Sequence, residues 1–423
     1  MRILHTADLH LGQILYQNYS RGDEHDHFFA QLEEWCGQYS PDVLLVSGDI
    51  FDIQQPGAAV KRRFNEYFVR LHETYPEMGI VITAGNHDSA SRLEAPRPLL
   101  SRYKVEIRGS VHRTWEATPE GGRWMNNYDD LIIPIKNPDG EEVVVLAVPY
   151  LRSDVVQNAD YSQGVNRFLR ELTQRARDLH PGKPLVMMAH MYAKGAEIAS
   201  KDASEKIVIG GQEEVNMEGW ADHPDYLTCG HIHKRQHIWN THWARYTGSV
   251  LPMSFAEVDY KHGVDMLTLV DNKVNVEFLE YTPQHRLRIL PEADEELTLN
   301  KLKKLMDVEL RPRGDDGKLS DSFDYVVLKV KMEKVSNEAI KELEDHLNSK
   351  DAVLCKIQKI IPSIDVTTIV GNQSIVTIDD ILDRDPLDTL KEAYVLEHKS
   401  EMSDAQISML RELVTSVRNE TKN

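Results

Sequence analysis

The chain opens with the stretch Met1-Arg2-Ile3-Leu4-His5-Thr6-Ala7-Asp8-Leu9-His10, in which a short, mainly apolar run ends at the triplet Asp8-Leu9-His10. Four more motifs follow in order, and they are Gly48-Asp49-Ile50-Phe51-Asp52, Gly85-Asn86-His87-Asp88, His190 and Gly230-His231-Ile232-His233. Each motif supplies carboxylate, amide or imidazole groups, which are ligands that hold Mn, Fe or Zn. A single D-x-H or H-x-H triplet is common by chance, so it is the ordered set of five that indicates a metal site.

An apolar run precedes each motif. These runs cover residues 2–7, 43–47, 80–84, 185–189 and 226–229. Short apolar segments bounded by turn residues predict strands that are buried on both faces. In a sheet covered by helices, ligands gather in the loops beyond the strand ends, and glycines 48, 85 and 230 suit tight turns there. The sequence therefore predicts that all five motifs converge at one edge of a layered α/β sheet.

The side-chain types predict how two metal ions would be held. Two cations about 3.5–4 Å apart need an anionic ligand between them, and the carboxylate of Asp49, with two oxygens to share, is the best candidate for that bridge. Asp8, His10 and one histidine of the last motif would complete one metal position. Asn86, His190 and the other histidine of that motif would complete the second.

The chemistry of such a pair follows from the charges. Two cations this close lower the pKa of a water held between them and hold a phosphate for in-line attack. His87 stands beside a predicted ligand, so it could stabilise developing charge or protonate the leaving oxygen. A purely structural explanation of the five motifs is disfavoured, because buried Asp and His side chains without a metal would leave several polar groups costly to satisfy.

The order D-x-H, G-D-x-x-D, G-N-H-D, H, G-H-x-H resembles that of the calcineurin-like metallophosphoesterases. The N-terminal stretch through Gly12, together with Tyr246-Thr247-Gly248-Ser249 and Ser254-Phe255-Ala256-Glu257, is similar to the SbcD nucleases of that family. This close resemblance covers about the first 260 residues. It implies a four-layer α/β/β/α sandwich with a small α/β capping domain and C-terminal helices.

Carried over position by position, the resemblance implies two divalent metal ions, with Mn²⁺ favoured, and makes His87 the catalytic histidine. One metal would be held by Asp8, His10, Asp49 and His233, and the other by Asp49, Asn86, His190 and His231. Some relatives have a histidine where this chain has Asp52. That difference leaves open any phosphate-positioning role at this site.

The same resemblance implies a DNA nuclease that acts with the ATPase SbcC in processing double-strand breaks and hairpins. The implied activities are 3′ to 5′ exonuclease action on duplex DNA and endonuclease action on single strands and hairpins, by a homodimer within a heterotetramer. Two other functions stay open on the sequence alone. The same site would suit a small-molecule phosphodiesterase or a protein phosphatase, and the chain could also be a noncatalytic subunit that organises a DNA-tethering ATPase.

Composition indicates a cytoplasmic protein of two or three domains. The 423 residues contain no apolar run of the ~18 residues that a membrane span needs, and Met1 leads into a strand rather than a signal peptide. Cys36, Cys229 and Cys355 are too widely spaced for a disulfide framework or a zinc finger. The net charge of −19 argues against a lone DNA-binding module, since nonspecific DNA affinity depends on Lys and Arg. Local basic patches or the metal ions could still attract DNA phosphates, and a partner could supply most of the DNA affinity.

The expected domains are a nuclease domain at 1–283, a capping domain at 284–372 and a C-terminal helical segment at 373–423. Within the capping domain the pattern predicts, in order, a helix over 295–308, a strand over 325–332, a helix through Ile340, Leu343 and Leu347, and a strand near 353–361. No cluster of residues in this domain suggests chemistry. By resemblance it shapes DNA access, and the sequence alone equally allows a structural appendage.

The last segment predicts a pair of amphipathic helices. Ser403 with Gln406 forms a capping box that opens the second helix. That helix has an apolar stripe made of Ile407, Leu410, Val414 and Val417. Between residues 379 and 423 there are 11 acidic and 6 basic residues, a local net charge of −5. Such a stripe often packs on its own domain, but the resemblance favours docking on the coiled-coil base of SbcC.

Three further patterns have simpler structural interpretations. His25-Asp26-His27 imitates a metal motif but opens a predicted helix and follows no strand. Asp88 is expected to orient an imidazole or to form a turn rather than to bind metal. Lys61-Arg62-Arg63 lies on a predicted helix with Phe64 and Leu71, and a solvated face is favoured over DNA contact.

Overall fold

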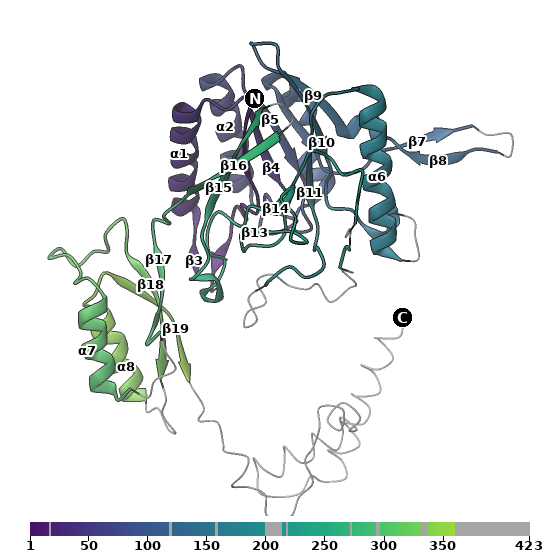
Figure 1. Ribbon diagram of the computed structural model, residues 1–423. Coiled ribbons are helices and arrows are strands. Elements are labelled where there is room, and N and C mark those ends of the chain that lie inside the picture. Colours follow the sequence, from purple (N-terminus) through teal and green to yellow (C-terminus); the bar gives the residue numbers. More distant parts are fainter. Residues whose placement is uncertain are drawn as a thin grey trace, which may run out of the picture. The chain divides into compact units, whose positions relative to one another are not determined.

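The computed structural model describes residues 1–16, 18–117, 121–156, 160–198, 214–216, 219–270, 273–292, 297–330 and 337–359 (Figure 1). Contacts along the chain define one unit at Met1–Ile361 and a second at Pro362–Asn423, and every described residue lies in the first. The expected C-terminal helices at 373–423 lie outside the described residues. None of the helices in the described part is both long and apolar enough to pass through a membrane.

The first of two large sheets is built around β1 (Arg2–Thr6). Its strand order is β16-β15-β1-β4-β5-β6. The strands β1, β4 (Val43–Ser47), β5 (Gly79–Thr83) and β6 (Val105–Arg108) are parallel. Strand β15 (Gly263–Val270) pairs antiparallel with β1, and β16 (Lys273–Glu280) pairs antiparallel with β15. The strands predicted over 2–7, 43–47 and 80–84 are thus confirmed within a residue at each end.

The second sheet has the order β13-β14-β12-β11-β10-β9. Its parallel strands are β10 (Glu142–Ala147), β11 (Leu185–His190), β12 (Tyr226–Gly230) and β14 (Ala244–Tyr246), and β9 (Ile132–Lys136) and β13 (Gln236–His237) are antiparallel to them. The predicted strands over 185–189 and 226–229 are β11 and β12. Cys229, buried in β12, packs in an apolar core, and all three cysteines are free.

Alternate side chains of the central strands enter two different cores, because successive residues of a strand point to opposite faces. In β4, Val43 and Leu45 pack against the other sheet, whereas Leu44 and Val46 pack against helices. Helices α1 (Gly22–Tyr39) and α2 (Ala58–Thr74) contribute to the core on the first sheet, and α6 (Tyr161–Leu179) contributes to the core on the second. Figure 1 shows these helices on the outer faces of the two sheets. The predicted four-layer α/β/β/α sandwich is confirmed.

Shorter elements connect these layers. They are β2 (Ile14–Leu15), β3 (Tyr19–Ser20), α3 (Ala90–Glu94), α4 (Arg97–Leu100), β7 (Arg113–Glu116), β8 (Arg123–Asn126), α5 (Ser153–Val156) and 3-10 turns at Ser101–Tyr103, Tyr128–Leu131 and Phe255–Glu257. The hairpin of β7 and β8 was not expected from the sequence. Its Trp115 and Trp124 stack edge-to-face while both stay exposed.

The basic stretch 61–63 lies on α2, where Phe64 and Leu71 are buried. Arg63 forms an ion pair with Asp26 at 3.2 Å and donates to the carbonyl of Gly22 at 3.0 Å. Lys61 and Arg62 are exposed. This placement agrees with a solvated helix face.

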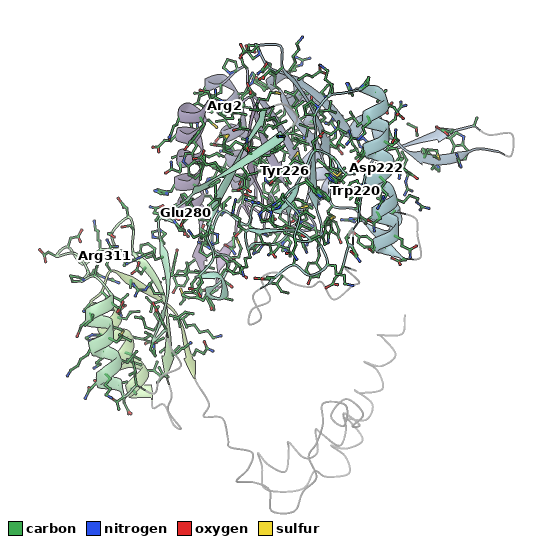
Figure 2. All side chains as sticks on the ribbon, in the orientation of Figure 1. Arg2, Trp220, Asp222, Tyr226, Glu280 and Arg311 are labelled. Carbon is green, nitrogen blue, oxygen red and sulfur yellow. The ribbon has the colours of Figure 1, made fainter. Side chains whose placement is uncertain are left out.

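A separate three-stranded sheet follows β16. Strands β17 (Arg286–Leu290), β18 (Asp324–Val330) and β19 (Ala352–Lys359) are parallel, and helices α7 (Leu299–Glu309) and α8 (Asn337–Leu347) make the crossovers. The predicted α7, β18, α8 and β19 are confirmed, but β17 was missed. Arg311, labelled in Figure 2, pairs with Asp351 at 3.0 Å and so fastens the polar loop after α7 to the residue just before β19.

Two histidines outside the metal motifs are buried parts of the framework. His25, in α1, donates from Nε2 to the carbonyl of Leu9 at 2.8 Å. This histidine therefore supports the loop that contains Asp8 and His10. Burial, together with the charge of Arg21, lowers the pKa of His25 to about 4. His262 donates to the carbonyl of Ser249 at 3.0 Å, and burial lowers its pKa to about 4 as well.

We expect the free energy of unfolding in EDTA to fall as the pH drops from about 6.5 to about 4. In this window the unfolded chain binds protons at His25 and His262 while the folded protein does not, so each histidine costs about 1.4 kcal/mol per pH unit. Urea unfolding at several pH values measures the slope. The slope should become shallower in His262→Gln and stay unchanged in His242→Gln, a control at an exposed position. Equal slopes in all three proteins would refute this account.

Candidate dinuclear metal centre

The five motifs meet at the carboxyl ends of strands from both large sheets. Asp8, Asp49 and Asn86 follow β1, β4 and β5 of the first sheet, whereas His190 ends β11 and His231 follows β12 of the second. Parallel strands present their carboxyl ends at the same edge, where ligand loops gather. The predicted convergence is therefore seen, but at the joint edge of two stacked sheets rather than at the edge of one.

Four of the predicted ligands have left-handed backbones. The angle φ is 52° at Asp8, 46° at His10, 46° at Asp49 and 100° at His231. This region is unfavourable for residues other than glycine, at about 1–3 kcal/mol each, and it persists only where the surrounding structure holds it. Strained backbones at three of the five motifs are typical of a functional site, because such strain gathers where side chains must be aimed.

Two glycines allow the loops to approach each other. A Cβ atom at Gly48 would lie 2.1 Å from Nδ1 of His190, and a Cβ at Gly85 would lie 2.1 Å from Oδ1 of Asp49. Both contacts are far shorter than atoms tolerate. The glycines of the G-D and G-N-H-D motifs are therefore required because ligands from neighbouring strands occupy the space beside them.

The first group of candidate ligand atoms comes from Asp8, His10 and Asp49. These residues are buried, and one ligand atom from each lies within 4.8 Å of the other two. Nε2 of His10 is 3.8 Å from Oδ2 of Asp49. The ring of His233 is beside this group, with its centroid 5.2 Å from that of His10. The two carboxylate oxygens of Asp8 accept the backbone N–H of His231 at 2.9 and 3.1 Å, which ties the two sheets together at the site.

The second group comes from Asp49, His190 and His231, whose ligand atoms are also within 4.8 Å of one another. The side-chain oxygen of Asn86 lies 2.9 Å from Nε2 of His190 and 2.9 Å from Nδ1 of His231. Nδ1 of His190 donates to the carbonyl of Ser47 at 3.1 Å, so Nε2 faces this group.

Asp49 belongs to both groups. Its Oδ2 atom is 3.8 Å from Nε2 of His10 and 3.4 Å from Nε2 of His190. Its Oδ1 atom accepts the backbone N–H of His87 at 2.9 Å, which fixes the carboxylate plane. One oxygen of Asp49 thus lies between two sets of nitrogen ligands.

The charges at the site are strongly perturbed. Burial would raise the pKa of Asp49, but His190, His10 and His87 together hold it well below its ordinary value. Burial lowers the pKa of His231 to about 3, and the charge of His190 adds to this effect. Asp49 is thus ionised and His231 neutral at pH 7, and these are the forms that bind a cation.

Asp8 and His190 are shifted upward. Burial raises the pKa of Asp8, and the charge of Asp49 adds to this. Burial would lower the pKa of His190, but the charge and hydrogen bond of Asp49, with the charge of Asp8, raise it to about 9. In the protein alone, the excess negative charge at the site therefore draws a proton onto His190.

His10 tests whether these side chains suit a metal ion. It is buried, yet within the described part of the chain neither ring nitrogen has a hydrogen-bond partner. A buried polar atom without a partner costs about 1–3 kcal/mol, and a cation on Nε2 would remove that cost there. Carboxylate, imidazole and amide groups together suit Mn, Fe and Zn. The residues therefore fit divalent cations.

His87 and Asp52 stand at the border of the site. Nδ1 of His87 is 2.9 Å from the backbone oxygen of Asp52, and its ring centroid is 5.0 Å from that of His10. The side chain of Asp52 reaches to 3.5 Å from Nδ1 of His10. Both residues are only half-buried. Asp52 thus has a backbone contact to His87 and a side-chain contact to a predicted ligand.

Asp88 fastens the loops and does not join the ligand groups. Its carboxylate accepts the backbone N–H groups of Ile50 at 3.0 Å, Phe51 at 2.9 Å and Gly85 at 2.8 Å. Burial and the charge of Asp49 nevertheless raise its pKa to about 7. Of the two expected roles, turn formation is the one that the contacts bear out.

Glu257 is a residue at the site to which sequence reasoning gave no role. It is fully buried, and its Oε1 accepts from Nδ1 of His233 at 3.0 Å. Carboxylates that hold the second nitrogen of a ligand histidine fix the orientation of the ring. The segment 254–257 was noticed only as a resemblance, because nothing in the sequence pairs it with a histidine 24 residues earlier.

Known proteins place this geometry in a family. A family model described as calcineurin-like phosphoesterase matches residues 1–235. A protein from Rhodobacter capsulatus, named as the SbcD component of the nuclease SbcCD, is 33% identical over 280 residues, which cover 64% of this chain and 66% of that protein. Proteins of the same name from Escherichia coli K12 and Bacillus subtilis are 28% and 30% identical, over 65% and 64% of this chain and 66% of each relative. The matched parts are just under two thirds of each relative's length.

The family match includes every predicted ligand. It begins at residue 1 and ends two residues after His233, so it contains all five motifs in their order along the chain. The resemblance inferred from those motifs is thereby confirmed. The match covers more than half of the residues of this chain, so the chain belongs to the calcineurin-like phosphoesterase family.

Proposed function

We propose that the chain is the nuclease component of a DNA-processing complex and cleaves phosphodiesters with two divalent metal ions. The observation that carries the proposal is the position of Asp49, whose Oδ2 lies 3.8 Å from Nε2 of His10 and 3.4 Å from Nε2 of His190. A carboxylate oxygen between two sets of ligands suits the two-metal sites of phosphatases and nucleases. Membership of the phosphoesterase family supports the same chemistry.

The ligand assignment follows the two groups. One metal position is assigned to Asp8, His10, Asp49 and His233, and the other to Asp49, Asn86, His190 and His231. The contacts of the two groups support this division, and the ring of His233 beside His10 supports the choice between the two histidines of the last motif. Mn²⁺ is proposed from the resemblance to SbcD nucleases, since the ligand types themselves also accept Fe and Zn.

With both cations held, the site would lower the pKa of a water between them and polarise the scissile phosphate. The chain itself contributes His87. The backbone oxygen of Asp52 can only accept, so Nδ1 of His87 carries a proton and donates it at 2.9 Å. Nε2 is then the free ring nitrogen, and when it too carries a proton, as in the imidazolium form, it can pass that proton to the leaving oxygen. His87 is half-buried, so a DNA phosphate can reach it.

DNA is the proposed substrate because the relatives in three bacteria are named as components of a nuclease. The proposed reactions are 3′ to 5′ removal of nucleotides from duplex ends and endonucleolytic cutting of single strands and hairpins. We also propose the partners, which are an SbcC-type ATPase bound through the C-terminal helices and a second copy of this chain. In a bacterium this work would take place in the cytoplasm, where the chromosome lies.

Two other functions would use parts of the same molecule. A small-molecule phosphodiesterase or a protein phosphatase would need the same two metals and ligands. A noncatalytic scaffold for a DNA-tethering ATPase would need neither. The two cation-binding groups around Asp49 favour catalysis over a scaffold, and the nuclease names of the relatives favour DNA over small esters.

The first prediction concerns His87. His87→Leu should keep its metal ions but lose about 10²–10⁴-fold in cleavage rate, because it removes a proton donor and not a ligand. The purified chain and the variant are incubated with blunt, 3′-labelled and hairpin DNA in Mn²⁺, Mg²⁺ or EDTA. His180→Leu, at a half-buried histidine in the C-cap of α6, is the matched control and should cleave normally.

The outcomes separate the candidate functions. Manganese-dependent cleavage that is lost in EDTA and in His87→Leu supports the nuclease. Turnover of a small phosphodiester without DNA cleavage, even after an SbcC-type ATPase and ATP are added, would leave the metal centre but remove the substrate. Full activity in His87→Leu would remove the role of His87.

The second prediction concerns the bridge. The wild-type chain should bind about two Mn²⁺ ions, Asn86→Ala should retain one of them, and Asp49→Ala should lose tight binding of both. The reason is that Asn86 touches only the second ligand group, whereas Asp49 belongs to both. Equilibrium dialysis with metal analysis measures the stoichiometry. Loss of a single ion in Asp49→Ala would show that this carboxylate is not shared.

The third prediction concerns the C-terminal segment. Leu410→Asp should weaken binding to an SbcC-type ATPase by about 10–100-fold, because burying a leucine is worth about 1.5–3 kcal/mol. The matched control is Ser416→Asp, which falls on the opposite side of the predicted helix. Copurification and a binding titration measure the affinity, while nuclease activity of the chain alone should not change. Equal binding by both variants would place the partner elsewhere.

A further inference from the structure

Glu257 connects a predicted metal ligand to the rest of the molecule. Its Oε1 accepts from Nδ1 of His233 at 3.0 Å, and its Oε2 accepts the backbone N–H of Met253 at 2.8 Å. An ionised carboxylate has no proton to donate and can only accept hydrogen bonds. Nδ1 of His233 therefore carries the proton, and Nε2 keeps its lone pair for a ligand bond. Both oxygens of Glu257 are used, and the side chain is fully buried.

The loop that contains Glu257 is tied to the loop that follows His10. The side-chain amide of Gln13 donates to the carbonyl of Met253 at 3.1 Å. Arg21, fully buried, donates to the carbonyl of Pro252 and to the side chain of Gln13, while Glu24 neutralises it at 2.6 and 2.7 Å. The backbone N–H of Gln13 also donates to the carbonyl of His10 at 3.0 Å. The supports of His10 and His233, two ligands of the first metal position, are therefore one hydrogen-bonded network.

The three-stranded sheet packs against both of these loops. Phe255, two residues before Glu257, shares an apolar cluster with Leu287, Tyr325 and Val327 of that sheet. Leu15 belongs to the same cluster, and β17 contacts the 3-10 turn at Phe255–Glu257. The connection thus runs from the small sheet through Phe255 and Glu257 to His233.

Two further contacts join the small sheet to the first loop. The hydroxyl of Tyr19 donates to the carbonyl of Leu354 in β19 at 2.9 Å. The ring of Tyr19 lies 5.6 Å from that of Tyr325 in β18. The ring of Tyr16, 5.6 Å from that of Phe255, joins the two loops to each other. The small sheet therefore grips the segment after His10 as well as the segment that holds Glu257.

The second metal position is supported differently. Nδ1 of His190 donates to Ser47 at the end of β4, and Asp88 fastens the loop that carries Asn86 to the loop after β4. These supports come from within the two large sheets. The two positions thus depend on different parts of the fold.

We propose that Glu257 is a positioning residue for His233 and that the small sheet holds it in place through Phe255. The docking of that sheet then tunes the metal position of Asp8, His10 and His233 while the position of Asn86, His190 and His231 is unaffected. This inference rests on the proposed assignment of the metal ligands. It gives the small sheet a function of its own, which is to set the occupancy of one metal position.

The test measures the two Mn²⁺ affinities separately in the full chain. The glutamine of Glu257→Gln has the size of the native side chain but cannot accept both N–H groups. The variant should therefore bind one of the two Mn²⁺ ions about 10–100-fold more weakly and bind the other with unchanged affinity. Calorimetry measures the affinities, and the electron paramagnetic resonance spectrum should change from that of a coupled pair to that of an isolated ion. Asp324→Asn is the matched control, since Asp324 is also buried but pairs with Arg286 in the small sheet.

A second pair of variants tests the sheet. Leu287→Ala, in the shared cluster, should lower the affinity for the same Mn²⁺ ion by about fivefold, because it loosens the packing on Phe255. Leu343→Ala removes the same atoms from the internal core of the small sheet and its helices, and it should leave both ions bound. If Glu257→Gln proves unstable, this pair alone decides the proposal.

The possible failures are distinct. A wild-type chain that binds no Mn²⁺ overturns the metal centre and this inference with it. A wild-type chain that binds two ions, with no change in Glu257→Gln, overturns the positioning role and leaves the metal centre intact. Equal weakening of both ions in Glu257→Gln, or equal effects of Leu287→Ala and Leu343→Ala, would mean general destabilisation and would also overturn the inference.

Discussion

The fold of this protein is organised around the burial of two carboxylates at one place. Asp8 and Asp49 are both buried, and the charge of Asp49 disfavours ionisation of Asp8. Buried charges are costly unless they are paired or bind metal. The chain answers this cost with imidazoles from two sheets, with the backbone N–H groups of His87 and His231, and with a geometry that suits cations.

Aiming these groups requires local strain, and the large sheets supply the rigidity that holds it. Asp8, His10 and Asp49 have left-handed backbones immediately after strands whose side chains are buried on both faces. A loop between such strands has little freedom to relax, because its ends are fixed by two cores. Gly48 and Gly85 then let neighbouring loops approach within the distance that shared ligands need. The buried strands, the strained backbones and the two glycines thus serve the same end, which is to aim the predicted ligands at one place.

Much of this was readable from the sequence, since apolar runs ending in Asp, Asn or His are local patterns. The sequence could not show that the runs divide between two sheets, because strand partners lie far apart in the chain. It missed β17, whose Arg286 and Arg288 interrupt the apolar pattern, and the hairpin of β7 and β8, whose tryptophans are exposed. Sequence reasoning assigned Glu257 no role because Glu257 and His233 are 24 residues apart, and only folding brings the two side chains together. His25 shows the converse, a motif-like residue whose position in α1 makes it a support for Leu9.

The acidic composition bears on how such a site meets a polyanion. With a net charge of −19, DNA would be repelled by much of the surface. Several arginines are already paired, as Arg63 is with Asp26, Arg97 with Asp130 and Arg175 with Asp129. Under the proposed function, cations held at the buried carboxylates would add attraction for phosphate at the site. In the proposed nuclease the metal ions would therefore help to bind the substrate as well as activate it. If that proposal holds, binding of DNA and its cleavage would depend on the same two ions, and the acidic surface would add little affinity of its own.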